Sequence, residues 1–367
     1  SDSRWNGRFS INRMNTDNEN YSDGAWDTST AAESLEFRLK SIVLQGANSP
    51  SDHRLTFALY HYTVDFSQRG IATPFGDPNQ DQSYDVTGYA AEYVGAAFKG
   101  FTWTANARLD DYSDFDNAFT WQLGASQQIN ASWKLRGSLG TGTKAPTFTE
   151  RFGFYPDYFI GNPDLKPETS KGWELGAETR FGNGNYLLSA TWFDQKLEDE
   201  IDGFVFDPAT FLFTARNRDT TSKRRGLELV FDGRINRAWS FVASYTYLKA
   251  TEKDGLGNSF AEIRRPENMA SLNLSYAFAS DRGNINLNIN YNGAQLDHVY
   301  RPPLFAQETV ALDSYTLIDI ATSWKLNQSL ELVGRISNLL DSDYEEIYGF
   351  AQPGRAIYGG LRGRFEL

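Results

Sequence analysis

Residues Asn284–Asn292 read Asn-Ile-Asn-Leu-Asn-Ile-Asn-Tyr-Asn, so an asparagine stands at every second position. The residues between the asparagines are Ile285, Leu287, Ile289 and Tyr291. Successive side chains of a β-strand point to opposite faces, so a strand here has one face of amides and one apolar face. A wall between lipid and water needs strands of this kind, and the stretch therefore predicts a strand of a transmembrane β-barrel.

The same alternation recurs along the chain, with connections that are short and long in turn. Segments 101–109 and 133–139 alternate in this way, with Phe101, Trp103 and Trp133 on their apolar faces. Outer-membrane barrels join their strands by tight turns at one end and by extended loops at the other. We therefore predict an all-β chain, a transmembrane antiparallel β-barrel with about 16 strands and no domain boundary within residues 1–367. We expect long connections at about 16–33, 68–83, 111–118, 143–168, 199–221, 252–265, 298–312 and 339–354, and short turns near 49–52, 99–100, 130–131, 182–185, 236–237, 280–283 and 327–329.

A soluble β-sandwich or propeller is the structural alternative, because both also contain many strands. Sandwich strands usually have about 5–6 residues, whereas the alternating segments here have roughly 10–14, enough to cross a membrane when tilted. A propeller would repeat a motif at about 40 residues, and the sequence has no such repeat. The pattern therefore favours the membrane barrel.

The composition agrees with a barrel wall and excludes several function classes. Aromatic residues make up 15% of the chain, yet its mean hydropathy is −0.52, as expected when only alternate residues face lipid. A net charge of −12 disfavours a nucleic-acid partner, and the absence of cysteine excludes disulfides and thiol nucleophiles. The sequence has no nucleophile-elbow or metal-hydrolase motif, so we expect no enzymatic activity and no firm cofactor.

The most specific signal lies in a long connection. From Gly140 the sequence reads GTGTKAPTFTERFGFYPDYFIGNPDLKPETSKGWELGAE. Its prolines fix φ and remove backbone donors, so they predict a rigid loop outside the sheet. The segment resembles the signature of TonB-dependent outer-membrane receptors. The matching residues include Lys144, Pro146, Glu150, Asn162, Pro163, Leu165, Pro167 and Glu168.

The end of the chain, from Ile336, resembles the last hairpin of the same receptors and is most similar to the cobalamin-receptor subgroup. The matching residues include Asn338, Gly354 and Arg355. The resemblance implies a 22-stranded barrel that holds an N-terminal plug domain, with TonB binding before the plug. About 16 strands would leave open edges in lipid, which is very unfavourable. We therefore expect the plug domain and the N-terminal barrel strands as partners, on a second chain or a fragment outside this sequence.

The function that the resemblance implies is TonB-dependent, energy-coupled uptake of a scarce large nutrient across the bacterial outer membrane. Cobalamin or another corrinoid is the expected ligand. A ferric siderophore is the alternative, followed by haem, for which the loop between the two signature elements offers tyrosines but no histidine. A passive 16-stranded porin is the competing class. The other expected partners are TonB, reached through the plug, and outer-membrane lipid and lipopolysaccharide.

Two groups of loop residues are candidate sites. We expect seven side chains either to touch the ligand or to pack on neighbouring loops: Phe152, Phe154, Tyr155, Tyr158, Phe159, Tyr300 and Arg301. The four aspartates Asp110, Asp111, Asp114 and Asp116 could ligate calcium, which prefers several oxygen ligands, or simply form a solvated loop. A basic run at 216–225 could bind lipopolysaccharide phosphates or neutralise nearby acids.

Overall fold

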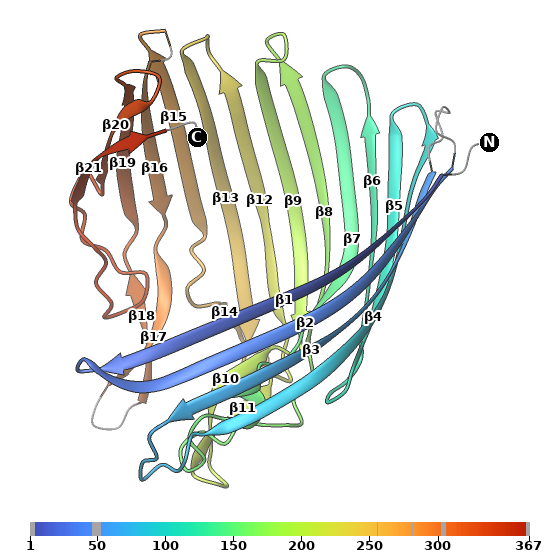
Figure 1. The fold of residues 1–367 in the computed structure, drawn as a ribbon, viewed down its shortest axis with the longest axis vertical. Helices are drawn as coiled ribbons and strands as arrows, with labels where there is room; N and C mark the ends of the chain where they lie inside the picture. The colour runs from blue at the N-terminus through green and yellow to red at the C-terminus, as the bar shows by residue number, and fades with distance from the viewer. Residues whose placement is uncertain (1–3, 46–52, 255, 281, 302–305, 365–367) are drawn as a thin grey trace. The chain divides into compact units, whose positions relative to one another are not determined.

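A computed structural model describes residues 4–45, 53–254, 256–280, 282–301 and 306–364 of the protein (Figure 1). These residues form 21 β-strands and the five-residue helix α1 (Phe148–Phe152). None of the described helical residues belongs to a helix long and apolar enough to cross a membrane. The strands are β1 (Arg4–Ser22), β2 (Ala25–Gln45), β3 (His53–Gly70), β4 (Gln80–Phe98), β5 (Phe101–Tyr112), β6 (Ala118–Gln128), β7 (Trp133–Lys144), β8 (Glu168–Phe181), β9 (Tyr186–Glu198), β10 (Ile201–Asp207), β11 (Leu212–Asn217), β12 (Ser222–Arg234), β13 (Trp239–Lys253), β14 (Ser259–Ala261), β15 (Asn268–Phe278), β16 (Gly283–Asn292), β17 (Gln295–Arg301), β18 (Ala306–Leu312), β19 (Tyr315–Lys325), β20 (Leu330–Ser337) and β21 (Ala356–Gly363).

Sixteen of these strands have eight or more residues, in agreement with the predicted number. The other five are short elements inside the long connections and were not predicted. They form the hairpins β10–β11 and β17–β18 and the three-residue strand β14, which pairs with β13. The short connections after β4, β6, β8, β12 and β19 fall where the sequence places them, whereas the predicted turn at 49–52 lies outside the described residues.

The chain groups into two compact units, which we describe separately. Unit 1 comprises residues 1–127, 137–173 and 195–222, and unit 2 comprises residues 128–136, 174–194 and 223–367. Strands β7, β8 and β9 contribute residues to both units, as does β6 through Gln128. The absence of a domain boundary within residues 1–367 stays a prediction.

In unit 1 the first six strands form consecutive antiparallel hairpins. β1 and β2 are joined at Asp23 and Gly24, whose φ angles of 51° and 78° suit the tight hairpin turn that Asp-Gly favours. Near this turn the Asn20 amide donates a hydrogen bond of 3.0 Å to the Thr28 hydroxyl across the strands. The expected long connection at 16–33 is therefore wrong, because its polar residues continue the two strands up to a two-residue turn.

One face of β1–β4 is apolar and exposed. Phe9, Ile11, Phe37, Phe57 and Leu59 all lie on it and are between 41% and 63% exposed. The register confirms the shared face, since Ile11 lies opposite Phe37 and opposed residues project to the same side. Large exposed apolar side chains at alternate positions are what the lipid-facing surface of a barrel requires.

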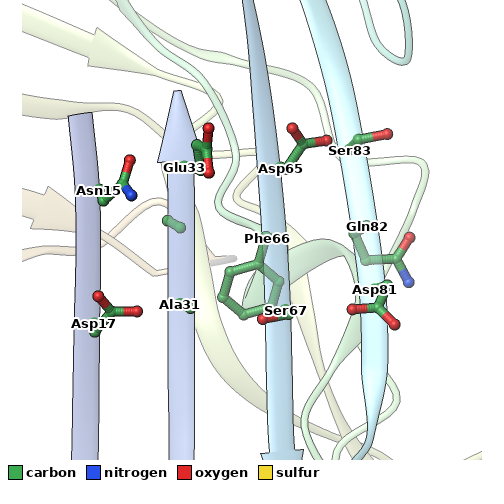
Figure 2. A pocket seen from close by; sticks show the side chains of 11 residues that line it. Asn15, Asp17, Ala31, Glu33, Asp65, Phe66, Ser67, Asp81, Gln82 and Ser83 are labelled. Atoms are coloured by element: carbon green, nitrogen blue, oxygen red, sulfur yellow. The ribbon is translucent and has the colours of Figure 1, made fainter. Parts of the chain in front are cut away.

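Further along the same strands this face becomes acidic. The register aligns two rows across β1–β4, and these line a shallow pocket of about 620 Å³ (Figure 2). The rows are Asn15, Glu33, Asp65 and Ser83, and Asp17, Ala31, Ser67 and Asp81. Two of the carboxylates are neutralised, because Arg13 pairs with Glu33 at 2.7 Å and Arg69 pairs with Asp81 at 2.6 Å. The pocket is thus a polar rim next to the apolar face.

In unit 2 the antiparallel pairing order is β12–β13–β15–β16–β19–β20–β21. The predicted two-faced strand is confirmed in β16. Its asparagines face Ser271, Asn273 and Ser275 of β15, whereas Ile289 lies between Leu272 and Ile318 on the other face. The register therefore extends the apolar face across three strands, while the amides of β16 face mainly serine and asparagine on β15 and a mixed row that includes Asp319 and Leu317 on β19.

Candidate ligand-binding site

Two long connections of unit 1, the segments 145–167 and 199–221, enclose one small apolar core. It consists of Phe159, Leu165 and Ala215, each at most 2% exposed. A third connection, 71–79, packs on the first, where Phe75 contacts Tyr158 and its carbonyl accepts the N–H of Asp157 at 2.9 Å. Backbone hydrogen bonds join the segments 145–167 and 199–221: Ile160 N–H donates to Phe213 O at 3.1 Å, and Phe213 N–H donates to Tyr158 O at 2.9 Å. The long connections are therefore ordered by one another.

Helix α1 and two glycines shape the segment 145–167. Thr147 and Glu150 form a capping box, in which each side chain accepts a hydrogen bond from the backbone N–H of the other residue. Gly153 and Gly161 have φ angles of 76° and 67°, and a Cβ on Gly153 would lie 2.1 Å from Phe159 O. Only glycine allows this close backbone crossing, which brings the two ends of the aromatic stretch together.

The loop residues of the family signature brace this structure. Lys144 Nζ lies 2.9 Å from Glu168 Oε1, which also accepts the N–H of Ile201 at 3.1 Å. The Asn162 amide donates to Ala215 O at 3.0 Å, and Leu165 belongs to the loop core. The signature residues therefore stabilise the structure of the loops through their contacts with the connection at 199–221.

The C-terminal signature residues brace a second connection in the same way. Asn338, which is 5% exposed, binds the Ser342 backbone through both its amide oxygen and its amide nitrogen, each at 2.9 Å. Asp341 accepts the N–H of Arg355 at 2.7 Å, and a Cβ on Gly354 would lie 2.9 Å from the same oxygen. These contacts hold the segment between β20 and β21.

The predicted ligand-facing residues divide between the loop core and the loop surface. Phe159 is 1% exposed and stacks on Phe154 and Phe204, so its ring holds the loops together and is not available to a ligand. Phe152 and Tyr155 are half-buried, whereas Tyr158 is exposed. Ligand contact stays a prediction for Phe152, Phe154, Tyr155 and Tyr158, whereas the ring of Phe159 is buried in the loop core.

Sequence reasoning missed most of the exposed rings beside Tyr158. We call them, together with Tyr158, the aromatic patch: Phe75, Tyr158, Phe204, Phe206 and Phe211. Ring centroids are 5.6 Å apart for Phe75 and Tyr158, 6.0 Å for Tyr158 and Phe204, and 6.3 Å for Phe206 and Phe211. Exposed clusters of large apolar side chains are characteristic of binding surfaces. The alternating phenylalanines at 204, 206, 211 and 213 were the signal that could have revealed this hairpin.

The predicted calcium ligands do not converge. Asp110 and Asp111 are adjacent in β5 and therefore project to opposite faces. Asp110 is 3% exposed and accepts hydrogen bonds from Tyr60 and Arg108, while Asp114 pairs with Arg151 at 3.6 Å. In the described part of the chain no three histidine, aspartate or glutamate side chains are grouped as metal ligands. The geometry of these aspartates does not fit a calcium site.

Two members of the basic run at 216–225 are paired with acids. Arg218 lies 3.4 Å from Asp202, and Arg224 forms an ion pair with Glu262. These pairs agree with the neutralising role, and binding of lipopolysaccharide phosphates stays a prediction.

Asp297 joins three connections of unit 2. It is fully buried, and its carboxylate accepts the backbone N–H groups of His298 at 2.8 Å and Tyr348 at 2.9 Å and the Arg264 guanidinium at 2.8 Å. Burial opposes its ionisation, but these donors outweigh burial and lower the pKa of Asp297 below its usual value. Arg301 pairs with Glu308 at 3.2 Å and donates to the Tyr348 hydroxyl at 3.2 Å, and its contact with a ligand stays a prediction. The side chain of Tyr300 lies outside the described residues.

Comparison with known proteins agrees with this architecture. The family described as "TonB dependent receptor-like, beta-barrel" matches residues 1–339. The chain belongs to this family. It is therefore part of the barrel of an outer-membrane receptor family rather than of an enzyme family.

Curated relatives of this TonB-dependent receptor barrel include two vitamin B12 transporters named BtuB. The protein from Photobacterium profundum is 32% identical over 69% of this chain, and that from Vibrio vulnificus is 29% identical over 75% of it. The matches cover 39% and 42% of those two proteins, so the chain spans about two fifths of their length.

Solved structures of siderophore receptors share the fold. The receptor PirA from Acinetobacter baumannii superimposes with a TM-score of 0.73 at 18% identity, over 99% of this chain and 60% of PirA. The ferripyoverdine receptor of Pseudomonas aeruginosa gives 0.75 at 14% identity, over 98% of this chain and 54% of that receptor. At these identities the likeness concerns the fold alone.

Proposed function

We propose that this chain forms barrel wall and outer loops of a receptor that takes up a corrinoid, such as cobalamin, across the outer membrane. The observation that carries the proposal is the 32% identity to a vitamin B12 transporter over 69% of the chain. A barrel of this family supplies the wall, and the ligand is held above it among the long connections.

The aromatic patch supports the binding step. Phe204, Phe206 and Phe211 expose between 47% and 78% of their surface on the β10–β11 hairpin, beside Tyr158. A large ligand with extended planar and apolar parts gains contact area and ring stacking on such a surface. Because the hairpin is anchored on the loop core, its rings are held in place before the ligand arrives, which reduces the entropy lost on binding.

Transport in this family also requires a plug domain and TonB. In the proposed cycle a plug domain closes the lumen, and TonB pulls on the plug in an energised cell so that the bound ligand can pass. The described residues contribute the lumen wall and the outer loops. Plug and TonB are thus proposed partners, inferred from the family.

A ferric siderophore is the second candidate ligand, since an aromatic patch also suits catecholate rings. A passive porin is disfavoured, because the family consists of receptors and because the chain carries their loop signature. A stable open pore formed by the receptor in planar bilayers, without TonB, would favour the porin.

The proposal is tested by uptake of radiolabelled cobalamin into cells that express the complete receptor. We expect binding with or without TonB but accumulation only with TonB and an energised inner membrane. Equal accumulation of cobalamin in the wild-type strain and in a TonB deletion strain would contradict energy coupling. Accumulation of a ferric siderophore without accumulation of cobalamin would show that the siderophore is the ligand.

A further inference from the structure

The polar face of unit 2 contains a field without ionisable side chains. It covers three neighbouring strands, at the even-numbered residues of 240–246, the odd-numbered residues of 269–277 and the even-numbered residues of 284–292. Amides and hydroxyls predominate there, with asparagine at all five positions of β16. Charged side chains begin on the flanking strands. Asp232 and Arg234 of β12 lie opposite Val242 and Ser240. Asp319 of β19 lies opposite Asn288, and its carboxylate accepts the backbone N–H of Asn338 at 2.8 Å.

The polar face of unit 1 differs. There Glu36 pairs with Arg38, and Asp110 pairs with Arg108 at 2.7 Å. The Arg38 and Arg108 guanidinium groups also lie over the ring of Tyr60, at 5.6 and 4.9 Å from its centroid. The polar face of unit 1 therefore carries paired charges, whereas the field on β13, β15 and β16 of unit 2 is neutral.

Two amide side chains of the neutral field have no side-chain hydrogen bond within the described residues and can therefore bind a ligand. Asn286 exchanges hydrogen bonds with Asn273 at 2.9 and 3.3 Å, and Ser244 contacts Ser271 at 2.7 Å. Asn288 and Asn290, the next two amides along β16, form no side-chain hydrogen bond within the described residues. Each can offer a carbonyl oxygen and an NH₂ group to a ligand.

The field follows the lumen across most of the membrane. Its five asparagines repeat at every second residue, about 7 Å apart, and span roughly 27 Å along the strand. At the usual strand tilt of about 40° this corresponds to about 20 Å across the membrane, compared with an apolar band about 25 Å tall. At the Ser275 end the field borders a groove of about 460 Å³, which is lined by Asn185, Ser240 and Asn273 and, on the β12 side, by the charged residues Asp232 and Arg234.

We propose that this neutral field is the track along which an uncharged, amide-bearing ligand leaves the receptor. The inference rests on the proposed corrinoid uptake, since the corrin periphery carries several neutral amide groups. The amides of Asn288 and Asn290 exchange hydrogen bonds with those groups one after another. The repeat lets the ligand form a bond with the next asparagine while it releases the last.

Absence of charge is the property that makes the field a track. A fixed charge in a confined lumen either holds water and counter-ions or traps an opposite charge, and both slow the passage of a neutral ligand. Repeated sites that bind weakly allow entry and exit alike. A ferric siderophore complex that carries a net negative charge would gain less from such a wall than a neutral ligand.

The test compares variants of the complete receptor in whole cells. Asn288→Asp with Asn290→Asp adds charge without changing size, and Asn288→Gln with Asn290→Gln keeps the amides. Asn106→Asp makes the same isosteric change on the polar face of β5, where the Asn106 amide donates to Gln122 at 3.2 Å. Binding is measured with labelled cobalamin in cells without TonB, and uptake is measured in energised cells.

We expect the double aspartate variant to bind cobalamin within twofold of wild type and to take it up about tenfold more slowly. The double glutamine and Asn106→Asp variants should keep at least half of the wild-type uptake rate. Heat-modifiable gel mobility shows whether each barrel is folded. Unchanged uptake in the double aspartate variant, or an equal loss in Asn106→Asp, overturns the track.

Two further outcomes distinguish failure of the proposed track from failure of the proposed corrinoid uptake. A wild-type receptor that neither binds nor accumulates cobalamin refutes the proposed function. Normal wild-type uptake, together with an aspartate variant whose plug becomes protease-sensitive before ligand is added, assigns the field to plug contact and overturns the track alone.

Discussion

Replacing Asp297 with alanine should loosen three outer connections of the receptor at once. The carboxylate holds the N–H of Tyr348 at 2.9 Å, the N–H of His298 at 2.8 Å and the guanidinium of Arg264 at 2.8 Å. These partners lie 51, 1 and 33 residues away along the chain. Asp297→Ala removes every acceptor in this cluster while leaving the β-strands of the wall untouched.

The size of the effect follows from which donors lose a partner. Hydrogen bonds to a charged acceptor contribute about 1.5–3 kcal/mol each, and two backbone donors lose theirs. The Arg264 side chain is 43% exposed, so water takes over much of its interaction and it adds little. We expect the free energy of local opening to fall by about 3 kcal/mol, which corresponds to roughly a hundredfold loss of protection.

Hydrogen exchange of the Tyr348 amide measures this directly. The matched control is Asp313→Ala, since Asp313 is exposed and forms no side-chain hydrogen bond among the described residues. We expect protection at Tyr348 to drop in Asp297→Ala and to stay within threefold in Asp313→Ala. Protection within threefold in both folded variants would refute the role assigned to Asp297.

Four other predictions concern the same structure. The folded-state pKa of Asp297 is lowered, so its contribution to loop stability is complete above its unfolded-state pKa, near 4, and is lost as the pH falls through the folded-state pKa. The protection of the Tyr348 amide against hydrogen exchange, corrected for the intrinsic exchange rate, should therefore be constant between pH 5 and 8. Phe159→Ala should destabilise the loop core by about 3–5 kcal/mol, which would be seen as faster hydrogen exchange at the Ala215 amide. Phe211→Ala should leave the loops folded and weaken cobalamin binding threefold to tenfold in equilibrium titrations. Phe57→Lys places a charge on the apolar face and should cost up to about 4 kcal/mol of barrel stability, measured as a lower urea midpoint in lipid vesicles; an unchanged midpoint would mean that this face does not contact lipid.

Local periodicity explains why the wall was predictable. The alternation in Asn284–Asn292 depends only on each residue's place in a strand, and the register with β15 and β19 preserves it. The failure at residues 16–33 has the opposite cause. Their polar composition suggested a loop, yet cross-strand pairing overrides composition once Asp23 and Gly24 form a two-residue turn.

The loops were harder to predict because their contacts join distant parts of the sequence. The sequence alone predicts that Phe159 faces a ligand, because it does not show that β11 covers this ring. Phe204 and Phe211 lie in a segment that the sequence predicts only as a long connection. Asp297 shows no motif, since its three partners meet only after folding. The family signature identified the protein class, but the structure assigns its residues to bracing.

Equilibrium binding of cobalamin to outer membranes that contain the complete receptor tests the central claim most directly. In membranes from cells without TonB, we expect saturable binding well below micromolar concentration that excess ferric siderophore does not displace. Absence of saturable cobalamin binding at micromolar concentration, in membranes where the folded receptor is present, would contradict the claim.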